Sequence, residues 1–388
     1  MRILCNCAPV QLGGGVGRYV ANLFRHMAQA GGDWHCTVAA KAHVGASIVP
    51  ADHRFSLLPI PEVAARSNYT RVIWEQTVLA GRARRMRPEV VFCPGNVDLL
   101  LASGTGLPSV VTINVSQPWV RPAEFPRGAG LYLRIFVKLS ARTATTLIAP
   151  TETTRRELIR AVGIAPQRIV AIPYGVDLSR FHPAEAGNEI GPWAAHQGVR
   201  QPYILSVSGI RRWKNFDTLV RAFAASGASR QGVQLVIAGR PLDAELSRGL
   251  RELCASLGVA DAVLFTGGVP EAEVAALYRM ARAYVFPSLF EGFGLTQIEA
   301  MASGVPLAVS RVSVMPEISR DAAVYFDPAD VEDMAAAIER VLWDDVLRAG
   351  LTSAGLRRAR DFSWAQTASR TMEVLAAAAA RREQEGRA

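Results

Sequence analysis

The chain has 388 residues, half of them hydrophobic and a fifth charged, which excludes a disordered protein and provides apolar material for more than one large core. No apolar run reaches the ~20 residues of a membrane-spanning helix, the first residues lack a signal-peptide pattern, and five cysteines show no metal-ligand spacing. The sequence therefore predicts a globular, cytoplasmic protein with reduced thiols.

The formal net charge of +9 is placed unevenly along the chain. Residues 1–183 hold 21 Lys and Arg against 10 Asp and Glu, whereas residues 184–388 hold 22 against 24. A basic half of this kind suits contact with anionic lipid headgroups or with a polyanionic substrate. Nucleic acid is not expected as the partner, because no nucleic-acid motif or array of aromatic and basic residues accompanies the charge.

Short apolar, β-branched runs alternate with longer helical patterns along the chain. In the first half, strands are predicted at "RILCN", "CTVAA", "VVFCP", "SVVTI", "TLIAP" and "RIVAIP". After residue 200, a second series is predicted at "YILSVS", "VQLVIAG", "AVLFTG", "AYVFPS" and "PLAVS". This alternation is typical of βαβ units, so we expect an α/β fold with two parallel-sheet domains.

The boundary between the two domains is predicted in the segment 178–200, which is rich in Gly, Pro and polar residues and has no sustained period. We place an N-terminal domain at 1–183 and a C-terminal domain at 184–362. Residues 363–388 are predicted to form a final helix with a charged tail.

The loop "GGGVGRY" follows the first predicted strand and opens the first predicted helix. Its glycines would let a phosphate or a sugar approach the backbone closely. It is not a dinucleotide fingerprint, because Val20 stands where a third small residue is needed and no acidic residue ends the second strand near Ala40. A plain tight turn is the alternative.

The stretch "FEGFGLTQIEAMASG" joins the predicted strand "AYVFPS" to a short helix that is expected to end at Gly304. Glu291 precedes this helix, and Glu299 is expected in or near its first turn. Backbone N–H groups at a helix start favour phosphate, and carboxylates accept hydrogen bonds from sugar hydroxyls. The layout suits a nucleoside diphosphate sugar. Alternatively, both glutamates only favour the helix dipole and meet water.

The longer stretch "VFPSLFEGFGLTQIEAMASGVPLAVSRVSVMPEI" resembles the C-terminal signature of glycosyltransferase family 4, in which seven residues separate two glutamates. Further matches follow in the family's order at "LGGGVGRYVANL", "TATTLIAPTETTRRELIRAVGIAPQRIVAIPYGVDLSRFHP", "RRWKNFDTLVRAF", "LVIAG", "FTGGVPEAEVAALYRMARAYVFPS" and "FSWAQTA". The resemblance covers nearly the whole chain. It implies the GT-B fold, with two Rossmann-like domains facing across a cleft and the C-terminal helix crossing back to the N-terminal domain. It also implies a retaining enzyme that uses nucleotide sugars.

The resemblance also implies roles for single residues in the C-terminal domain. Glu299 would hold the ribose hydroxyls of the donor, and Glu291 would contact the transferred sugar. Lys214 would neutralise the leaving diphosphate, where cationic stabilisation is needed. The other residues expected at the donor are Gly292, Phe293, Gly294 and Leu295, through their backbone N–H groups, and Gly239.

In the N-terminal domain, the resemblance places the glycine loop near the donor phosphates and the acceptor. The residues concerned are Gly14, Gly15 and Gly17.

Two positions depart from the family pattern. Ser208 stands six residues before Lys214, where an arginine is expected, so Arg211 or Arg212 would take over its role. Asn114, in "TINVSQPW", stands where many members have a histidine that contacts the donor sugar. Asparagine does not take a proton near neutral pH, so Asn114 would act by positioning. The resemblance implies that no protein base is needed at this point, because in retaining enzymes of this fold the leaving phosphate can take the acceptor's proton; the departure is thus compatible with activity, and an inactive protein is the alternative.

Two basic segments lie in the N-terminal domain, which faces the acceptor in this family. One is "GRARRMRPE", with Arg82, Arg84, Arg85 and Arg87, and the other is "GLYLRIFVKLSART". They would rest on an anionic membrane that carries a lipid-linked acceptor, at the inner face of the cell membrane. Solvated helix faces are the alternative.

Together these features predict a metal-independent, retaining glycosyltransferase that moves a hexose from a UDP- or GDP-linked sugar to a hydroxyl acceptor. A saccharide or lipid-linked acceptor in polysaccharide or glycolipid biosynthesis is expected, with mannose suggested by association. No metal or separate cofactor is expected, because no Asp-x-Asp motif ends a strand and Asp344 and Asp345 fall in a helical stretch. The alternatives are a catalytically degenerate GT-B binding protein, a phosphorylase or an epimerase.

Overall fold

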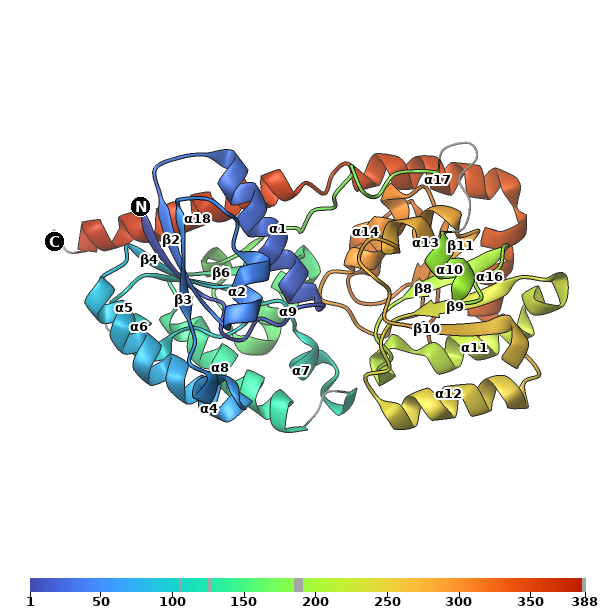
Figure 1. Ribbon diagram of the computed structural model, residues 1–388, viewed down its shortest axis with the longest axis horizontal. Helices are drawn as coiled ribbons and strands as arrows, with labels where there is room; N and C mark the ends of the chain where they lie inside the picture. Colours follow the sequence, from blue (N-terminus) through green and yellow to red (C-terminus); the bar gives the residue numbers. More distant parts are fainter. Residues whose placement is uncertain (105, 125–126, 185–190, 386–388) are drawn as a thin grey trace. The chain divides into compact units, whose positions relative to one another are not determined.

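We describe a computed structural model of the chain for residues 1–104, 106–124, 127–184 and 191–385 (Figure 1). The chain divides into two compact units. Unit 1 comprises Met1–Gly175 and Ser363–Ala388, and unit 2 comprises Val176–Phe362.

Unit 1 contains a seven-stranded parallel sheet with the order β3-β2-β1-β4-β5-β6-β7. In the centre of the sheet, Cys5 lies opposite Val38 on one side and Phe92 on the other. The inner strands are almost wholly buried, as expected for a parallel sheet that helices cover on both faces. The strands are β1 Arg2–Asn6, β2 His35–Ala40, β3 Phe55–Pro59, β4 Val90–Cys93, β5 Ser109–Thr112, β6 Thr146–Ala149 and β7 Ile169–Ala171.

The helices of unit 1 bury one face each against this sheet or against one another. The long helices are α1 Gly15–Ala30, α8 Arg127–Thr143, α9 Glu152–Val162 and α18 Trp364–Glu385. The shorter ones are α2 Ala42–Ile48, α3 Glu62–Ala65, α4 Asn68–Trp74, the π-helical turn η1 Glu75–Leu79, α5 Ala80–Met86, α6 Leu100–Ser103 and α7 Gln117–Val120. The 3₁₀ turns are η2 Pro122–Glu124 and η3 Pro166–Arg168.

Helix α18, at the end of the chain, packs along α1 and over strands β4 and β5. Its first residue, Trp364, lies near Tyr174, with ring centroids 5.9 Å apart, and Tyr174 stacks on Tyr19 at 4.4 Å. This aromatic stack fixes the start of α18 within unit 1.

Unit 2 contains a six-stranded parallel sheet with the order β10-β9-β8-β11-β12-β13. Its strands are β8 Tyr203–Val207, β9 Gln234–Ala238, β10 Val263–Gly267, β11 Ala283–Phe286, β12 Leu307–Ser310 and β13 Ala323–Phe326. Its helices are α10 Pro192–His196, α11 Phe216–Ala225, α12 Ala244–Ser256, α13 Val274–Met280, α14 Leu295–Ala302, α15 Met315–Ser319, α16 Val331–Trp343 and α17 Asp345–Ala359. Its 3₁₀ turns are η4 Arg212–Lys214, η5 Ala228–Gln231 and η6 Ala260–Ala262. One large core joins α11 and α16 to the sheet, with Phe223 and Ile338 wholly buried in it.

The prediction of an α/β fold with two parallel sheets is confirmed. Strands β3 and β13 were not predicted, and each lies at an edge of its sheet. In β3 only Phe55 is buried and the strand ends in the exposed Pro59, and β13 is short and only half-buried. Edge strands pair on one side only, so they do not need the continuous apolar run that marks the inner strands.

The first unit ends earlier than the sequence suggested, after Gly175 rather than after residue 183. The amide of Val176 donates to the Phe362 carbonyl at 3.2 Å, and the Phe181 ring packs edge-on against Tyr278 at 5.8 Å. These contacts attach residues 176–183 to unit 2. The predicted linker at 178–200 contains α10, and its residues 185–190 lie outside the described part of the chain.

Candidate active site

The loop that follows strand β11 leads directly into helix α14. Gly294 is the residue before the helix and has φ of 90°, a left-handed conformation that glycine adopts without strain. No acidic side chain lies in the first turn of α14, so its backbone N–H groups present positive charge at this end. The Phe293 side chain is buried against Phe362, with ring centroids 5.9 Å apart. Gly292 and Gly294 have no side chain, so the loop directly before α14 presents little side-chain bulk.

Glu299 is the fifth residue of α14, so it lies at the start of the second turn, close to the first turn as expected. It is almost fully buried, and its Oε2 accepts a hydrogen bond from the Tyr278 hydroxyl at 3.1 Å. Tyr278 comes from α13 and forms a row of rings with Tyr284 and Phe286 of β11. A buried carboxylate needs such a partner to offset its lost hydration. Helix α14 ends as predicted, with Gly304 at φ of 74°.

Lys214 and Glu291 form an ion pair, with Nζ 2.5 Å from Oε1. The two side chains are only 15% and 14% exposed, so solvent screens the pair less than it screens surface pairs. The Lys214 ammonium also lies 5.4 Å from the centre of the Phe286 ring. The structure thus brings together two residues that are 77 positions apart in the chain.

Asn215 holds Lys214 near the end of strand β11. It adopts a left-handed conformation with φ of 58°, and its side-chain amide donates to the carbonyls of Pro287 at 3.2 Å and Pro328 at 2.8 Å. In the same region, the Leu289 amide donates to the Trp213 carbonyl at 2.8 Å. The sequence did not identify this role, although an asparagine directly before a helix is the residue type that tolerates this conformation.

Ser313 holds the backbone of Glu291 from the other side. Its Oγ donates to the Glu291 carbonyl at 3.0 Å and accepts from the Glu291 amide at 3.2 Å. Ser313 lies in the loop between β12 and α15 and has φ of 57°, which is uncommon for a residue with a side chain. No local sequence signal identifies this residue, because the contact spans 22 positions.

Gly239 follows strand β9 and lets the neighbouring loop pass closely. A Cβ at this position would lie 1.9 Å from the Ser208 carbonyl oxygen. The close approach extends the pairing of β8 with β9, because the Ser208 amide donates to Ala238 and the Ile210 amide to Arg240. Gly239 therefore has a structural role that accounts for its residue type.

The two arginines proposed to replace the missing family arginine differ in their surroundings. The Arg211 guanidinium lies 5.2 Å from the centre of the Trp213 ring, whereas Arg212 is exposed. At position 208, where the family has an arginine, the Ser208 hydroxyl donates to the Gly209 carbonyl at 3.3 Å. Stacking on Trp213 gives Arg211 the more defined position of the two.

In unit 1, Asn114 follows strand β5 and is buried. Its Nδ2 donates to the Pro94 carbonyl at 2.8 Å, and its Oδ1 accepts from the hydroxyl of Tyr174. Its backbone amide donates to Asn96 Oδ1 at 2.7 Å. The carboxamide is therefore held at both ends.

The glycine loop of unit 1 contains positions of two kinds. A Cβ on Gly17 would lie 2.3 Å from the Gln11 carbonyl oxygen, so Gly17 is required where the chain folds over the start of α1. Gly14 and Gly15 are exposed, with open space where a Cβ would stand. They lie at the N-terminus of a 16-residue helix without acidic residues in its first turn, which suits an anion.

Asp344 and Asp345 have other roles. Asp344 caps α17 by accepting from the Leu347 amide at 2.9 Å, and the Asp345 side chain is exposed. Among the described residues, no group of three or more His, Cys, Asp or Glu side chains is placed to hold a metal ion. Within the same described ranges, no helix combines the length and apolar character needed to cross a membrane.

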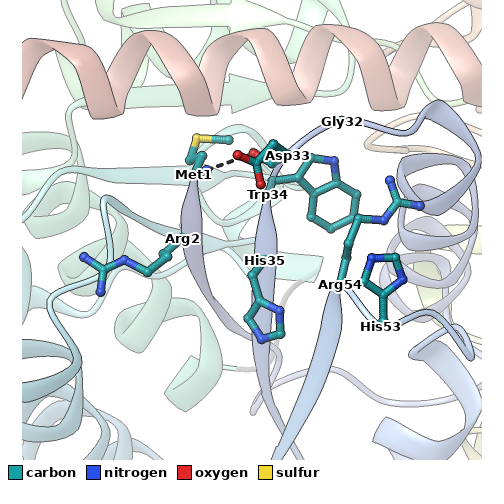
Figure 2. A pocket seen from close by; sticks show the side chains of 8 residues that line it. All are labelled: Met1, Arg2, Gly32, Asp33, Trp34, His35, His53 and Arg54. Carbon is teal, nitrogen blue, oxygen red and sulfur yellow. Dashed lines mark hydrogen bonds between the residues drawn. The ribbon is translucent and has the colours of Figure 1, made fainter.

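A pocket in unit 1 is lined by none of these residues (Figure 2). It surrounds the amino-terminal ends of β1 and β2, where the chain's amino group donates to the Asp33 carbonyl at 2.9 Å. Arg54 lies over the Trp34 ring and is paired with Asp52 at 2.7 Å. In open parallel sheets, ligands bind at the carboxyl ends of the strands, where Asn114 and Glu291 follow β5 and β11.

Two family descriptions match the chain, each over one part of it. "Glycosyltransferase Family 4" matches residues 13–180, and "Glycosyl transferases group 1" matches residues 194–358. An MMP alpha-(1->4)-mannosyltransferase of Mycolicibacterium hassiacum is 31% identical over 323 residues, 78% of this chain and 74% of the relative. An O-antigen chain mannosyltransferase B of Escherichia coli is 28% identical over 273 residues, 69% of each chain. A D-inositol 3-phosphate glycosyltransferase of Salinispora arenicola is 34% identical over 249 residues, 61% of this chain and 56% of the relative's length.

Solved structures share the whole architecture at low identity. The structure of HepE from Anabaena in complex with UDP and glucose has a TM-score of 0.77 and 17% identity, and the match covers 97% of this chain and 100% of that one. The sucrose-phosphate synthase of Thermosynechococcus elongatus has a TM-score of 0.76 and 22% identity, with 96% and 98% covered. With the family matches in both halves, these likenesses show that the chain belongs to glycosyltransferase family 4 and has the GT-B fold.

Proposed function

We propose that the chain is an active, metal-independent, retaining glycosyltransferase, which transfers a hexose from a nucleoside diphosphate sugar to a hydroxyl acceptor. The observation that carries the proposal is the Lys214–Glu291 ion pair, which lies beside the start of α14. In this proposal Glu291 meets the donor's sugar, Lys214 and the helix N–H groups meet the diphosphate, and the carboxylate of Glu299 meets the ribose.

Each residue has one task in this proposal. The carboxylate of Glu299 accepts hydrogen bonds from ribose hydroxyls, and the N–H groups at Gly292 to Leu295 hold the diphosphate. When the donor binds, the Lys214 ammonium leaves the Glu291 carboxylate and pairs with the diphosphate. Its positive charge then stabilises the leaving group. Glu291 then accepts hydrogen bonds from the hydroxyls of the transferred sugar.

The transfer keeps the configuration of the anomeric carbon. The bond from this carbon to the phosphate oxygen breaks, and a bond to the acceptor oxygen forms on the same face. The proton of the acceptor hydroxyl passes to the leaving phosphate oxygen, so the products are the glycoside and a nucleoside diphosphate. No protein base is needed, which agrees with an asparagine at position 114.

The relatives support a choice of donor and acceptor. Two of those named above are mannosyltransferases, which supports mannose as the hexose, and one acts on an O-antigen chain, which supports a saccharide or lipid-linked acceptor. The structural neighbour with bound UDP supports a nucleotide donor, UDP- or GDP-linked. We place the reaction in polysaccharide or glycolipid biosynthesis, in the cytoplasm and at the inner face of the membrane.

The test is a panel of UDP- and GDP-linked hexoses with saccharide and lipid-linked acceptors, in the presence of a chelator. We expect nucleoside diphosphate release that depends on the acceptor, and a product with the donor's anomeric configuration by NMR. An inverted product, or activity that the chelator abolishes, would overturn the proposal. Donor binding without turnover would indicate a degenerate binding protein instead, as the uncharged Ser208 allows. Orthophosphate-dependent turnover would indicate a phosphorylase, and epimerised sugar without acceptor an epimerase.

A further inference from the structure

Exposed large apolar side chains are concentrated in one part of unit 1. Of the sixteen such side chains among the described residues, ten fall between Val63 and Leu139. Only four belong to unit 2, and they are Leu178, Leu242, Trp343 and Val346. Single exposed apolar side chains are ordinary, but a concentration of this kind marks an interaction surface.

Helix α8 is apolar on two sides. Its inner side buries Val137 and Ala141, whereas Leu131, Ile135 and Leu139 are exposed at intervals of four residues. At 100° per residue, these three side chains span one face of the helix, and Lys138 and Arg142 project from the same face. The 17 residues of α8 include no Asp or Glu. The solvent side of α8 is therefore apolar and cationic together.

A second stripe of the same character runs along α4, η1 and α5. Tyr69, Ile73 and Val78 are exposed, Tyr69 to 84%, and Arg82 and Arg85 continue the line. Along Tyr69, Ile73, Val78 and Arg82, successive exposed side chains are separated by four, then five, then four positions. The step of five falls where η1 forms a π-helical turn, which takes one more residue than an α-turn and so keeps the stripe on one face.

The two stripes are neighbours. Helix α6 packs against η1, α5 and α8, and the Arg84 guanidinium donates to the carbonyl of Leu101 on α6. Leu101 is itself exposed. Figure 1 shows α4, α5, α6 and α8 gathered on one side of unit 1. We call these exposed side chains the basic-apolar face: Tyr69, Ile73, Val78, Arg82, Arg85, Leu101, Leu131, Ile135, Lys138, Leu139 and Arg142.

Negative charge is nearly absent from these segments. Residues 67–87 and 127–143 hold nine Lys and Arg and one acidic residue, Glu75. The Glu75 carboxylate is buried and pairs with Arg71 at 3.0 Å, so it does not reach the surface. The face thus presents cations between apolar side chains, without anions to neutralise them.

We propose that the basic-apolar face docks on anionic lipid bilayers. The apolar side chains enter the boundary between headgroups and acyl chains, and the basic side chains meet lipid phosphates. The proposal deepens the proposed function, because it places unit 1 at the surface where a lipid-linked acceptor would lie. A twofold dimer through this face is disfavoured, because it would bring like charges together without acidic partners.

The test measures sedimentation of the full chain with vesicles. One set is phosphatidylcholine alone, and the other also contains phosphatidylglycerol. One variant carries Leu131→Ser with Ile135→Ser, and a second carries Arg82→Gln with Lys138→Gln. The matched controls lie on exposed positions of unit 2: Val346→Ser for the first, and Arg221→Gln with Arg340→Gln for the second.

We expect binding only to the vesicles with phosphatidylglycerol, and weaker binding as salt rises. The basic variant should bind about thirtyfold more weakly, since each basic residue near an anionic surface contributes about a factor of five. The apolar variant should lose most binding, and both controls should bind like the natural chain. Turnover of a water-soluble acceptor should stay the same in all variants.

Equal binding to both kinds of vesicle would overturn the proposal, as would equal losses in the unit 2 controls. Chain dimerisation, or binding to single-stranded nucleic acid, that the same substitutions abolish while vesicles do not bind would also overturn it. This test can be distinguished from that of the proposed function. If the chain releases nucleoside diphosphate but binds no vesicles, only the membrane-docking proposal is refuted.

Discussion

The ammonium of Lys214 lies 2.5 Å from the carboxylate of Glu291, so two groups proposed to meet different parts of the donor neutralise each other in the structure. In the proposed reaction, each of the two groups exchanges its partner when a donor binds. Before a donor binds, the mutual attraction of the pair offsets the cost of holding two charges in a partly buried site.

Lys214→Met should lower kcat by about two to three orders of magnitude, because a fixed cation at the leaving group is lost. Glu291→Gln should also lower kcat, but it should leave the affinity for nucleoside diphosphate unchanged or increase it, since it releases Lys214 for the diphosphate. Calorimetry with the nucleoside diphosphate, beside steady-state kinetics, tests the pair. Equal losses of nucleoside diphosphate affinity in both variants would refute the partner exchange.

Glu299→Gln should weaken nucleoside diphosphate binding about tenfold to a hundredfold, because hydrogen bonds to a charged group contribute roughly 1.5–3 kcal/mol. Tyr278→Phe removes the hydroxyl that holds the carboxylate at 3.1 Å and should give a smaller loss of affinity, of the same sign. Fluorescence titration with the nucleoside diphosphate measures both. Unchanged affinity in Glu299→Gln would show that the ribose assignment is wrong.

Ser313 positions Glu291 through two hydrogen bonds and adopts a left-handed backbone conformation. Both Ser313→Ala and Ser313→Gly should lower kcat by roughly a factor of ten, the value of about one such bond, with little change in KM for the acceptor. Ser313→Gly should be the more stable of the two, because glycine adopts φ of 57° without strain. Full activity in Ser313→Gly would show that backbone conformation, and not the hydroxyl, matters.

Asn114→Ala should lower the free energy of unfolding by about 1–3 kcal/mol, because it removes the buried hydrogen bonds to the Pro94 carbonyl and from the Tyr174 hydroxyl. The residual transfer should keep the pH profile of the natural chain, since asparagine carries no titrating proton. Urea denaturation and pH–rate profiles measure the two effects. A profile that loses one limb would assign Asn114 a part in proton transfer.

Glu75 should make stability depend on pH. Burial raises the pKa of this carboxyl to about 7 from its ordinary value of 4.5, and Arg71 opposes the shift. Because the folded pKa lies above the unfolded one, the stabilising contribution is present below pH 4.5 and is lost as pH rises to about 7. We compare the free energy of unfolding of the natural chain with that of the Glu75→Gln variant. Between pH 4 and pH 8, this difference should change by about 3 kcal/mol in favour of the variant. A difference that stays constant with pH would contradict this.

The sequence by itself determined the fold class and half of the candidate site. Alternating apolar runs and helical patterns predicted the inner strands of both sheets, because a buried parallel strand is marked by its own residues. The spacing of Glu291 and Glu299 and the lysine of "RRWKN" predicted the residues that we propose for the donor side, because family motifs are contiguous. The two edge strands β3 and β13 were not predicted, because their own residues form weaker apolar patterns.

Only the tertiary structure decided which residues support the site. Tyr278, Ser313 and Asn215 act on residues or carbonyls 21 to 113 positions away in the chain, and no pattern within a strand or a helix specifies such a contact. The basic-apolar face likewise depends on the packing of α6 between two stripes that the sequence separates. Local sequence specifies the elements, and the burial of their apolar faces decides which side chains of distant elements meet and which stay exposed.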